Sequence, residues 1–390
     1  MLRRIWWLSV VPLASIVLAL LVGAIIIVIS SVVTTGALDL ALPIVAYESM
    51  FEGATGVSFL NTDDGLALEF AIDAERAARN LTSTLVATSP LILTGLAVGV
   101  GFKAGLFNIG GTGQVLIGGF AAAIVGAAVA DLPVPVAVTI AVLAGALGGT
   151  LYGFIPGALK AYTGAHEVVS TIMLNSLAAF VIIGLVNDVF KIVGPSFART
   201  ADVGNAAMPI LFGRNGHLGI LIALAIVPIT YFLLYKTTIG FEIRTTGANP
   251  SAARYAGMSP RRLIILTMSL CGLFAGLAGT LEILLLGFYP AVFGTTIGFA
   301  GITVAMLGRS HPFGILLAAL LLGAMRAGAP NMQIQAGVPV EIIDVIQGVI
   351  LLFIAAEIVV RRLLRIRSAA GGAPAELATV SRTYGGERAA

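Results

Sequence analysis

Long apolar stretches are the feature that most constrains how this chain can fold. A helix needs about 20 mostly apolar residues to cross the hydrocarbon core of a bilayer, because about 30 Å is covered at 1.5 Å per residue. The eighth such stretch of the chain is rich in glycine and the ninth is short, so either is a candidate for a re-entrant element. Ten stretches qualify, roughly 8–30, 81–101, 111–130, 136–159, 168–187, 217–235, 263–286, 291–308, 313–328 and 342–360.

The composition supports a membrane protein. Of the 390 residues, 58% are hydrophobic and 11% are charged, whereas about a quarter of the residues of a soluble domain carry charge. We therefore expect an all-α, polytopic membrane domain over residues 1–367, with about ten transmembrane helices, and a disordered cytoplasmic tail over 368–390. The basic residues are spread over short loops instead of one face, which argues against nucleic acid as a partner.

The positions of lysine and arginine predict the orientation of the spans. Arg3 and Arg4 precede an apolar run that is longer than the core of a signal peptide, so we expect a retained first span. Placing the N-terminus inside puts sixteen basic residues on the cytoplasmic side and five on the other side. This bias predicts a multi-pass protein with both termini in the cytoplasm.

Two connections fall on the external side in this topology. The segment 34–80 carries eight acidic residues against only Arg76 and Arg79, which predicts an acidic external loop. The segment 187–216 contains Gly194, Pro195 and Arg199. It is either a docking surface for an external partner or a solvated connection.

The cytoplasmic loop 237–262 contains the signals of a short helix. Asn249 can act as N-cap, Pro250 can occupy the first helical position, and Gly257 can end the helix. A short amphipathic helix on the cytoplasmic face can receive mechanical work from another protein. The alternative is a structured loop whose basic residues lie at lipid headgroups.

Polar residues inside the apolar stretches are candidates for a substrate path. The stretch 99–119 interrupts its apolar pattern with glycines and polar residues, and unwound backbone at membrane depth is tolerated only inside protein or beside a water-filled cavity. Ionisable residues at this depth are functional candidates by default. A structural pairing with arginine or a backbone group is the alternative for each of them. The candidate path residues are Asn108, Gln114, Glu167, Thr171, Asn175 and Glu282.

Small residues recur every fourth position in two of the stretches. Such stripes let helices approach closely, so we assign them to packing and not to a substrate. The residues are Gly145, Gly149, Gly153, Gly157, Gly272 and Gly276.

Several kinds of chemistry lack their sequence signatures. No lysine follows a glycine, so the chain has no G-x-x-x-x-G-K-[ST] phosphate loop and is not itself an ATPase. The sequence contains neither HExxH nor GxSxG, which argues against a membrane-embedded hydrolase. Cys271 is the single cysteine, so neither a disulfide framework nor a cysteine-rich metal site is expected. We therefore predict no catalytic, cofactor-binding or metal-binding residues.

Five segments, in order, resemble the ABC-transporter permease family for nucleosides and simple sugars, which belongs to a larger group with branched-chain amino acid and ribose permeases. They are FKAGLFNIGGTGQVLIGG, GALKAYTGAHEVVSTIMLNS, TTGANPSAARYAGMSPRRL, GITVAMLGRSHPFGILLAALLLGAMRAGA and VPVEIIDVIQGVILLF. HEVVSTIMLN and the length of the chain resemble the longer of two paired permeases in nucleoside systems. Thr112 and Ala300 depart from the family, since many relatives have an acidic residue at each position.

The resemblance implies the ABC importer permease fold in the plasma (inner) membrane. It implies three protein partners: a cytoplasmic ATPase that binds ATP and Mg²⁺, a second related permease, and an external substrate-binding lipoprotein. It also implies that the helix at Asn249–Gly257 couples to the ATPase. The residues expected to do so are Asn249, Pro250, Ala252, Ala253, Arg254, Tyr255 and Gly257.

The expected mechanism is alternating access, in which the ATPase supplies the energy that reorients the helices around a central path. A nucleoside is the favoured solute, and a simple sugar or a branched-chain amino acid is the alternative. An ion-coupled secondary transporter is the rival from another class. Such a transporter needs a site for the coupling ion, but this chain has too few convincing carboxylates near the midplane of the membrane. It would also leave the loop 237–262 without a function.

Overall fold

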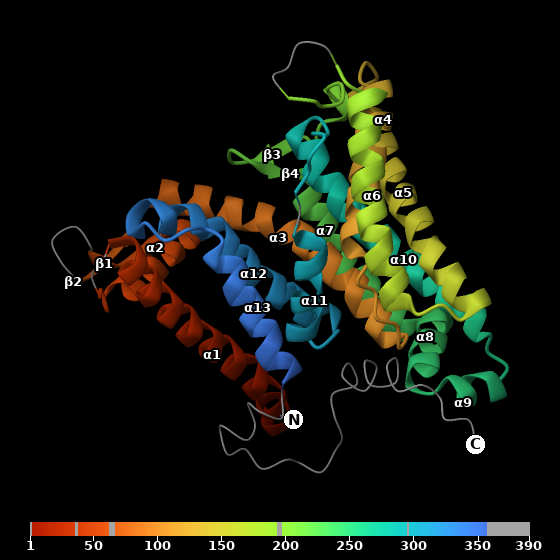
Figure 1. Ribbon diagram of the computed structural model, residues 1–390, viewed down its shortest axis with the longest axis horizontal. Coiled ribbons are helices and arrows are strands. Elements are labelled where there is room, and N and C mark those ends of the chain that lie inside the picture. The colour runs from red at the N-terminus through yellow and green to blue at the C-terminus, as the bar shows by residue number, and fades with distance from the viewer. Residues whose placement is uncertain (1, 36–37, 62–66, 193–196, 295, 357–390) are drawn as a thin grey trace. The chain divides into compact units, whose positions relative to one another are not determined.

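The computed structural model describes residues 2–35, 38–61, 67–192, 197–294 and 296–356 (Figure 1). The predicted tail 368–390, together with Gly194 and Pro195, lies outside the described residues. The helices are α1 (Leu2–Thr35), α2 (Leu42–Thr55), α3 (Ala74–Lys103), α4 (Gly111–Ala128), α5 (Val134–Thr163), α6 (Glu167–Asp188), α7 (Leu218–Lys236), α8 (Thr238–Ala248), α9 (Pro250–Tyr255), α10 (Pro260–Leu286), α11 (Ile297–Leu307), α12 (Pro312–Ala336) and α13 (Ile342–Ala355). A 3-10 turn (Gly204–Ala206) and four short strands, β1 (Val57–Asn61), β2 (Ala67–Ile72), β3 (Ile210–Phe212) and β4 (Gly216–His217), complete the list.

The prediction of an all-α, polytopic membrane protein is confirmed. Eight of the described helices are long and apolar enough to cross a membrane. The eighth predicted span is not a full one, because the 11 residues of α11 cover only about 16 Å. The ninth, which the sequence marks as short, is the 25-residue helix α12 and is long enough to span.

The chain forms two compact units. The first contains α1, α2, β1, β2, α13, the part of α3 up to Thr88 and the part of α12 from Leu320. The second contains α4 to α11 with the remaining parts of α3 and α12, from Ser89 and up to Ala319.

The predicted glycine stripes bring α4, α5 and α10 of the second unit side by side, as Figure 1 shows. A Cβ added to Gly149 would lie 2.6 Å from the Cα of Gly276 and closer still to the carbonyl oxygen of Gly272. One added to Gly157 would lie 2.9 Å from the Cβ of Met268. The assignment of these stripes to helix packing is confirmed.

In the first unit, α1 packs through one face, on which every fourth residue from Ser15 to Ser31 is buried and all but Ile27 are small. A Cβ on Gly23, one of these residues, would lie 2.8 Å from Ile346 of α13. α13 is joined to α12 by the ion pair between Arg326 and Asp344, at 3.4 Å.

The segment 34–80 differs from the predicted acidic loop. Its described part folds into α2 and an antiparallel hairpin of β1 and β2, and α3 begins at Ala74 instead of near residue 81. The hydroxyl of Tyr47 donates to the carbonyl oxygen of Leu20 at 2.6 Å, so α2 lies against α1. The number of acidic residues did not indicate the helix α2, because its apolar residues are interleaved with acidic ones.

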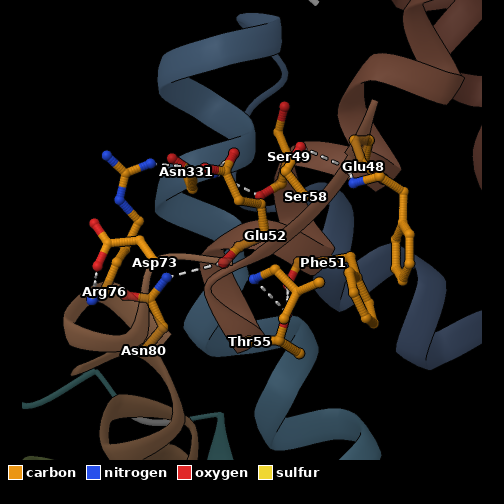
Figure 2. Close-up of polar contacts among 12 residues, drawn as sticks. Glu48, Ser49, Phe51, Glu52, Thr55, Ser58, Asp73, Arg76, Asn80 and Asn331 are labelled. Atoms are coloured by element: carbon orange, nitrogen blue, oxygen red, sulfur yellow. Dashed lines mark hydrogen bonds and ion pairs between the residues drawn. The ribbon is translucent and has the colours of Figure 1, made fainter. Parts of the chain in front are cut away.

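Asp73 caps the start of α3. Its Oδ1 accepts hydrogen bonds from the backbone N–H groups of Arg76 and Glu75, at 3.1 and 3.0 Å (Figure 2). The bond from Arg76 contributes most to lowering the pKa of this exposed carboxyl below its ordinary value, since it favours the charged form.

The described part of the segment 187–216, which the sequence predicts to be external, contacts the segment that follows α10. The backbone N–H of Thr200 donates to the carbonyl oxygen of Tyr289 at 3.0 Å. The Arg199 guanidinium lies 4.3 Å from the ring centre of Phe288 and forms an ion pair with Asp202 at 2.7 Å. This connection is therefore structured by contacts within the chain.

Candidate coupling surface and substrate path

The predicted interruption of the apolar pattern near residue 105 is a break between two helices. α3 ends in a Schellman motif, in which Gly105 adopts a φ of 73°. The backbone N–H of Leu106 donates to the carbonyl oxygen of Gly101 at 2.9 Å. The backbone N–H of Gly105 donates to the carbonyl oxygen of Phe102 at 3.1 Å. Seven residues without helical structure, 104–110, then lead to α4.

Amide side chains support this break. The Asn108 side chain accepts from the Gly110 N–H at 2.9 Å and donates to Gln114 Oε1 at 3.0 Å. Asn175 of α6 accepts from the Gly113 N–H at 2.8 Å and donates to the Ile109 carbonyl at 3.0 Å. These bonds satisfy backbone groups that the first turn of a helix leaves without partners. We call Asn108, Gln114 and Asn175 the amide network.

The amide network is closed to solvent at two of its three members. Asn108 and Gln114 are each 1% exposed, and Asn175 is part-buried. The Nε2 of Gln114 is buried without a hydrogen-bond partner among the described residues. An unsatisfied buried donor costs about 1–3 kcal/mol, so this atom is a candidate for a contact that forms in another state.

The other predicted path residues have different surroundings. Thr171 lies beside the amide network, since a Cβ on Gly110 would be 3.0 Å from its Cβ, but its hydroxyl donates back to the Glu167 carbonyl at 2.7 Å. Glu167 is buried and forms an ion pair with Lys160. The Glu167 carboxylate therefore has a charged partner within the chain.

Glu282 is not part of this group. It lies on α10 about 16 Å beyond Cys271, which is near Asn108 across Gly101. The carboxylate of Glu282 lies near Tyr289, where burial first and this negative charge second raise the pKa of the tyrosine. Contact of any of the six residues with a solute stays a prediction.

The predicted helix in the loop 237–262 is present as α9. Asn249 Oδ1 accepts from the N–H groups of Ser251 and Ala252, both at 3.1 Å, and Pro250 occupies the first turn. Gly257, with a φ of 82°, ends the helix, and the Met258 N–H donates to the Ala253 carbonyl at 3.0 Å. The predicted cap, first turn and end are confirmed.

The surface of α9 is available to a partner except at one residue. Tyr255 is 97% exposed, which is unusual for a large aromatic side chain. Ala253 is fully buried within the chain, unlike the other residues predicted to couple to a partner, and its part in coupling stays a prediction. The other predicted coupling residues, Asn249, Pro250, Ala252, Arg254 and Gly257, are all exposed.

Sequence reasoning missed α8, which directly precedes α9. The N-cap of α8 is Thr237, whose hydroxyl accepts a hydrogen bond from the Gly240 N–H at 3.1 Å. This threonine is the sequence signal that could have predicted the start of the helix. Near its other end, Gly247 meets the break after α3. A Cβ on Gly247 would lie 2.7 Å from the carbonyl carbon of Ala104 and 2.8 Å from the backbone nitrogen of Gly105. We call this backbone contact between Gly247 and residues 104–105 the glycine contact.

Comparison with known proteins shows which family the chain belongs to. The model of the family described as branched-chain amino acid transport system / permease component matches residues 80–355. The chain is 40% identical to the guanosine ABC transporter permease protein NupP of Bacillus subtilis, over 71% of this chain and 81% of that protein. It is 33% identical to the nucleoside ABC transporter permease protein NupB of Lactococcus lactis, over 91% and 92%. It is 32% identical to the glucose ABC transporter permease protein TsgB13 of Haloferax volcanii, over 77% and 83%. No solved structure matches the chain.

Proposed function

Because this chain belongs to the permease-component family of branched-chain amino acid transport systems, we propose that it forms the path for a nucleoside in an ATP-driven importer of the plasma membrane. The support for a nucleoside is that two relatives, at 40% and 33% identity, are described as guanosine and nucleoside permeases. A sugar is the second candidate, because a relative at 32% identity is described as a glucose permease.

The partners in this proposal follow from the family. A cytoplasmic ATPase binds ATP and Mg²⁺, a second related permease completes the membrane part, and an external lipoprotein delivers the solute. This chain binds neither the nucleotide nor the metal ion. In the proposed orientation, both of its termini and the loop with α8 and α9 are cytoplasmic.

The observation that carries the mechanism is the continuous connection from α9 to the break between α3 and α4. α9 presents Tyr255 to the ATPase, and α8 follows any displacement of α9 because only Asn249 separates the two helices. At the glycine contact, backbone meets backbone, so no flexible side chain absorbs the displacement.

Beyond the glycine contact, the displacement reaches the start of α4 through residues 106–110. The amide network holds these residues rigidly to α4 and α6. A push on α9 therefore changes the angle between α3 and α4 without melting the break. The ATPase biases the transporter between two states by binding them with different affinity, as any population shift requires.

Gly247→Ala tests this mechanism. The added methyl group separates α8 from residues 104–105, so we expect uptake to fall while the ATPase still binds and hydrolyses ATP. Gly184→Ala is the matched control, because nothing lies within 4 Å of its added Cβ. Full uptake by Gly247→Ala in reconstituted vesicles would remove the glycine contact from the mechanism.

The class of protein and the solute are tested separately. Purification of the chain from native membranes in mild detergent should recover an ATPase and a second permease, and deletion of its gene should abolish uptake of radiolabelled guanosine. Recovery of the complex with guanosine uptake intact, and glucose uptake lost, would replace the nucleoside by a sugar. A chain that transports alone in vesicles, driven by an ion gradient, would be a secondary transporter.

A further inference from the structure

The segment around α9 is positively charged. Between Glu242 and Glu282 the sequence contains four arginines and neither aspartate nor glutamate. Three of these arginines, Arg254 on α9 and Arg261 and Arg262 in the first turn of α10, are exposed. We call these three the arginine surface. Among the described residues, none of the three has an ion-pair partner.

A structured turn joins the two helices that carry the arginine surface. Only residues 256–259 separate α9 from α10, and Gly257 adopts a φ of 82° in this connection. The Gly257 N–H donates to the Arg254 carbonyl and the Met258 N–H donates to the Ala253 carbonyl, both at 3.0 Å. Figure 1 shows α9 beside α8, at one end of the second unit. The three arginines are therefore held by hydrogen-bonded structure and not by an irregular loop.

The start of α10 is an unfavourable place for two cations. Backbone N–H groups without intrahelical partners give the N-terminus of a helix a partial positive charge, so acidic residues stabilise this end and basic residues do not. Arg261 and Arg262 add to this charge, and the N-cap residue Ser259 forms no capping hydrogen bond. The stability of α10 therefore does not explain these arginines, whereas an anionic surface outside the chain would compensate them.

The side chains beside the arginines favour a protein over lipid as the source of that negative charge. An interfacial helix inserts large apolar side chains such as leucine, phenylalanine or tryptophan into the bilayer. Tyr255 is the one large apolar side chain that α9 exposes, and the six residues of α9 cover only about 9 Å. Tyrosine and arginine are among the residues that dominate the binding energy of protein interfaces.

Small residues next to the arginine surface leave room for a partner. Ala252, Ala256 and Gly257 are exposed, and nothing lies within 4 Å of a Cβ added to Gly257. Carboxylates of a partner can therefore approach the guanidinium groups without obstruction from large neighbouring side chains. An arginine can donate two parallel hydrogen bonds to the two oxygens of a carboxylate, so such pairs also fix the orientation of the partner.

We propose that the surface of the ATPase that receives α9 is acidic, with aspartate or glutamate side chains that pair with Arg254, Arg261 and Arg262 around a slot for Tyr255. This inference rests on the proposed function, in which an ATPase binds α9, and adds the chemistry of the surface that the ATPase presents. The charges steer the encounter and set the orientation, while Tyr255 supplies the apolar contact.

Two variants at one position test the sign of the charge on the partner. Ser251 is an exposed residue of α9, so Ser251→Lys and Ser251→Glu add opposite charges close to the arginine surface. This chain, with the second permease recovered with it, is placed in phosphatidylcholine nanodiscs. The association rate and the dissociation constant of the purified ATPase are then measured. Arg214→Gln, which removes an exposed arginine from the segment 187–216, is the matched control.

Removal of the arginines gives a second reading. We expect Arg254→Gln, Arg261→Gln and Arg262→Gln each to raise the dissociation constant by about 3–5-fold at low salt, as for exposed ion pairs. Each should also flatten the dependence of the dissociation constant on sodium chloride between about 0.05 and 0.5 M, since salt screens exposed charges. Ser251→Lys should accelerate association and Ser251→Glu should slow it, by about 3-fold each, whereas Arg214→Gln should change neither constant.

Three results would overturn the proposal. Equal effects of Ser251→Lys and Ser251→Glu, with an affinity that does not depend on salt, would mean that the partner surface is neutral. Native affinity in all three arginine variants would assign the arginines to lipid headgroups. Failure of the native chain to bind any ATPase would overturn the proposed function as well, whereas binding that is insensitive to charge removes this inference alone. The Ser251 variants decide the test if an arginine variant does not fold.

Discussion

The substitution Gly149→Ala examines a close contact between two helices, α5 and α10, of the second unit. The new Cβ would lie 2.6 Å from the Cα of Gly276, whereas ordinary contact begins near 3.4 Å. The neighbouring atoms are backbone, so no rotamer change relieves the overlap and α5 must move away from α10 by about 1 Å.

The size of the effect follows from two opposing terms. Overpacking a close contact costs typically 1–3 kcal/mol, and a contact between two backbones belongs near about 3 kcal/mol. Replacing glycine by alanine inside a helix returns up to about 1 kcal/mol. The net loss is about 2 kcal/mol of unfolding free energy, which corresponds to a melting temperature lower by about 4–8 °C on the scale of soluble domains.

Thermal melting of the detergent-solubilised chain, followed by size-exclusion chromatography, measures this effect. Gly184→Ala on α6 makes the same chemical change where nothing lies within 4 Å of the new Cβ, so its melting temperature should stay equal or rise. The reasoning fails if the two variants melt at the same temperature, because the close approach of α5 and α10 would then have no energetic consequence.

Three further predictions concern α9, the amide network and the cap of α3. Tyr255→Ala should weaken binding of the ATPase by about 2 kcal/mol, or about 30-fold, because aromatic side chains often anchor interfaces. Tyr162→Ala changes another exposed tyrosine and should leave the affinity unchanged in the same pull-down titration. Asn175→Leu leaves the Gly113 N–H without its partner and should lower the unfolding free energy by about 1–3 kcal/mol in the melting assay. Asn187→Leu, on the exposed side of the same helix, is the control, and an equal loss in that variant would contradict the prediction. Because the pKa of Asp73 is lower in the folded chain than its ordinary 3.8, its contribution is present above that pH and is lost as the pH falls below it. The protection of the first turn of α3 against hydrogen exchange, taken relative to the intrinsic rate at each pH, should therefore fall on acidification in the native chain. This pH dependence should be lost in Asp73→Asn, which keeps a capping oxygen.

Local signals were sufficient where the structure depends on neighbouring residues. The start and end of α9 follow from Asn249, Pro250 and Gly257, whose roles need no distant contact. The spacing of the glycines from Gly145 to Gly157 likewise identifies a packing face before the partner helix is known.

Features that depend on distant residues could not be predicted from the sequence. Nothing near Ala253 indicates that it alone is buried on α9, and nothing near Tyr47 indicates a bond to Leu20. The ion pair of Glu167 with Lys160 depends on how α5 and α6 meet. In each case the contact joins two helices or segments, and the pattern of residues along the chain does not predict how these lie relative to one another.

The amide network also has a consequence for the order in which the chain can be assembled during synthesis. The bonds from Asn175 to residues 113 and 109 span 62 and 66 positions, so α4 leaves the ribosome well before the side chain that completes its first turn. Until α6 arrives, the backbone N–H of Gly113 and the carbonyl of Ile109 need other partners, which lipid does not supply. We therefore expect the insertion machinery to retain α3 and α4 in a hydrated or protein-lined site until α6 has been made, and chains truncated before residue 175 to be poor at leaving it.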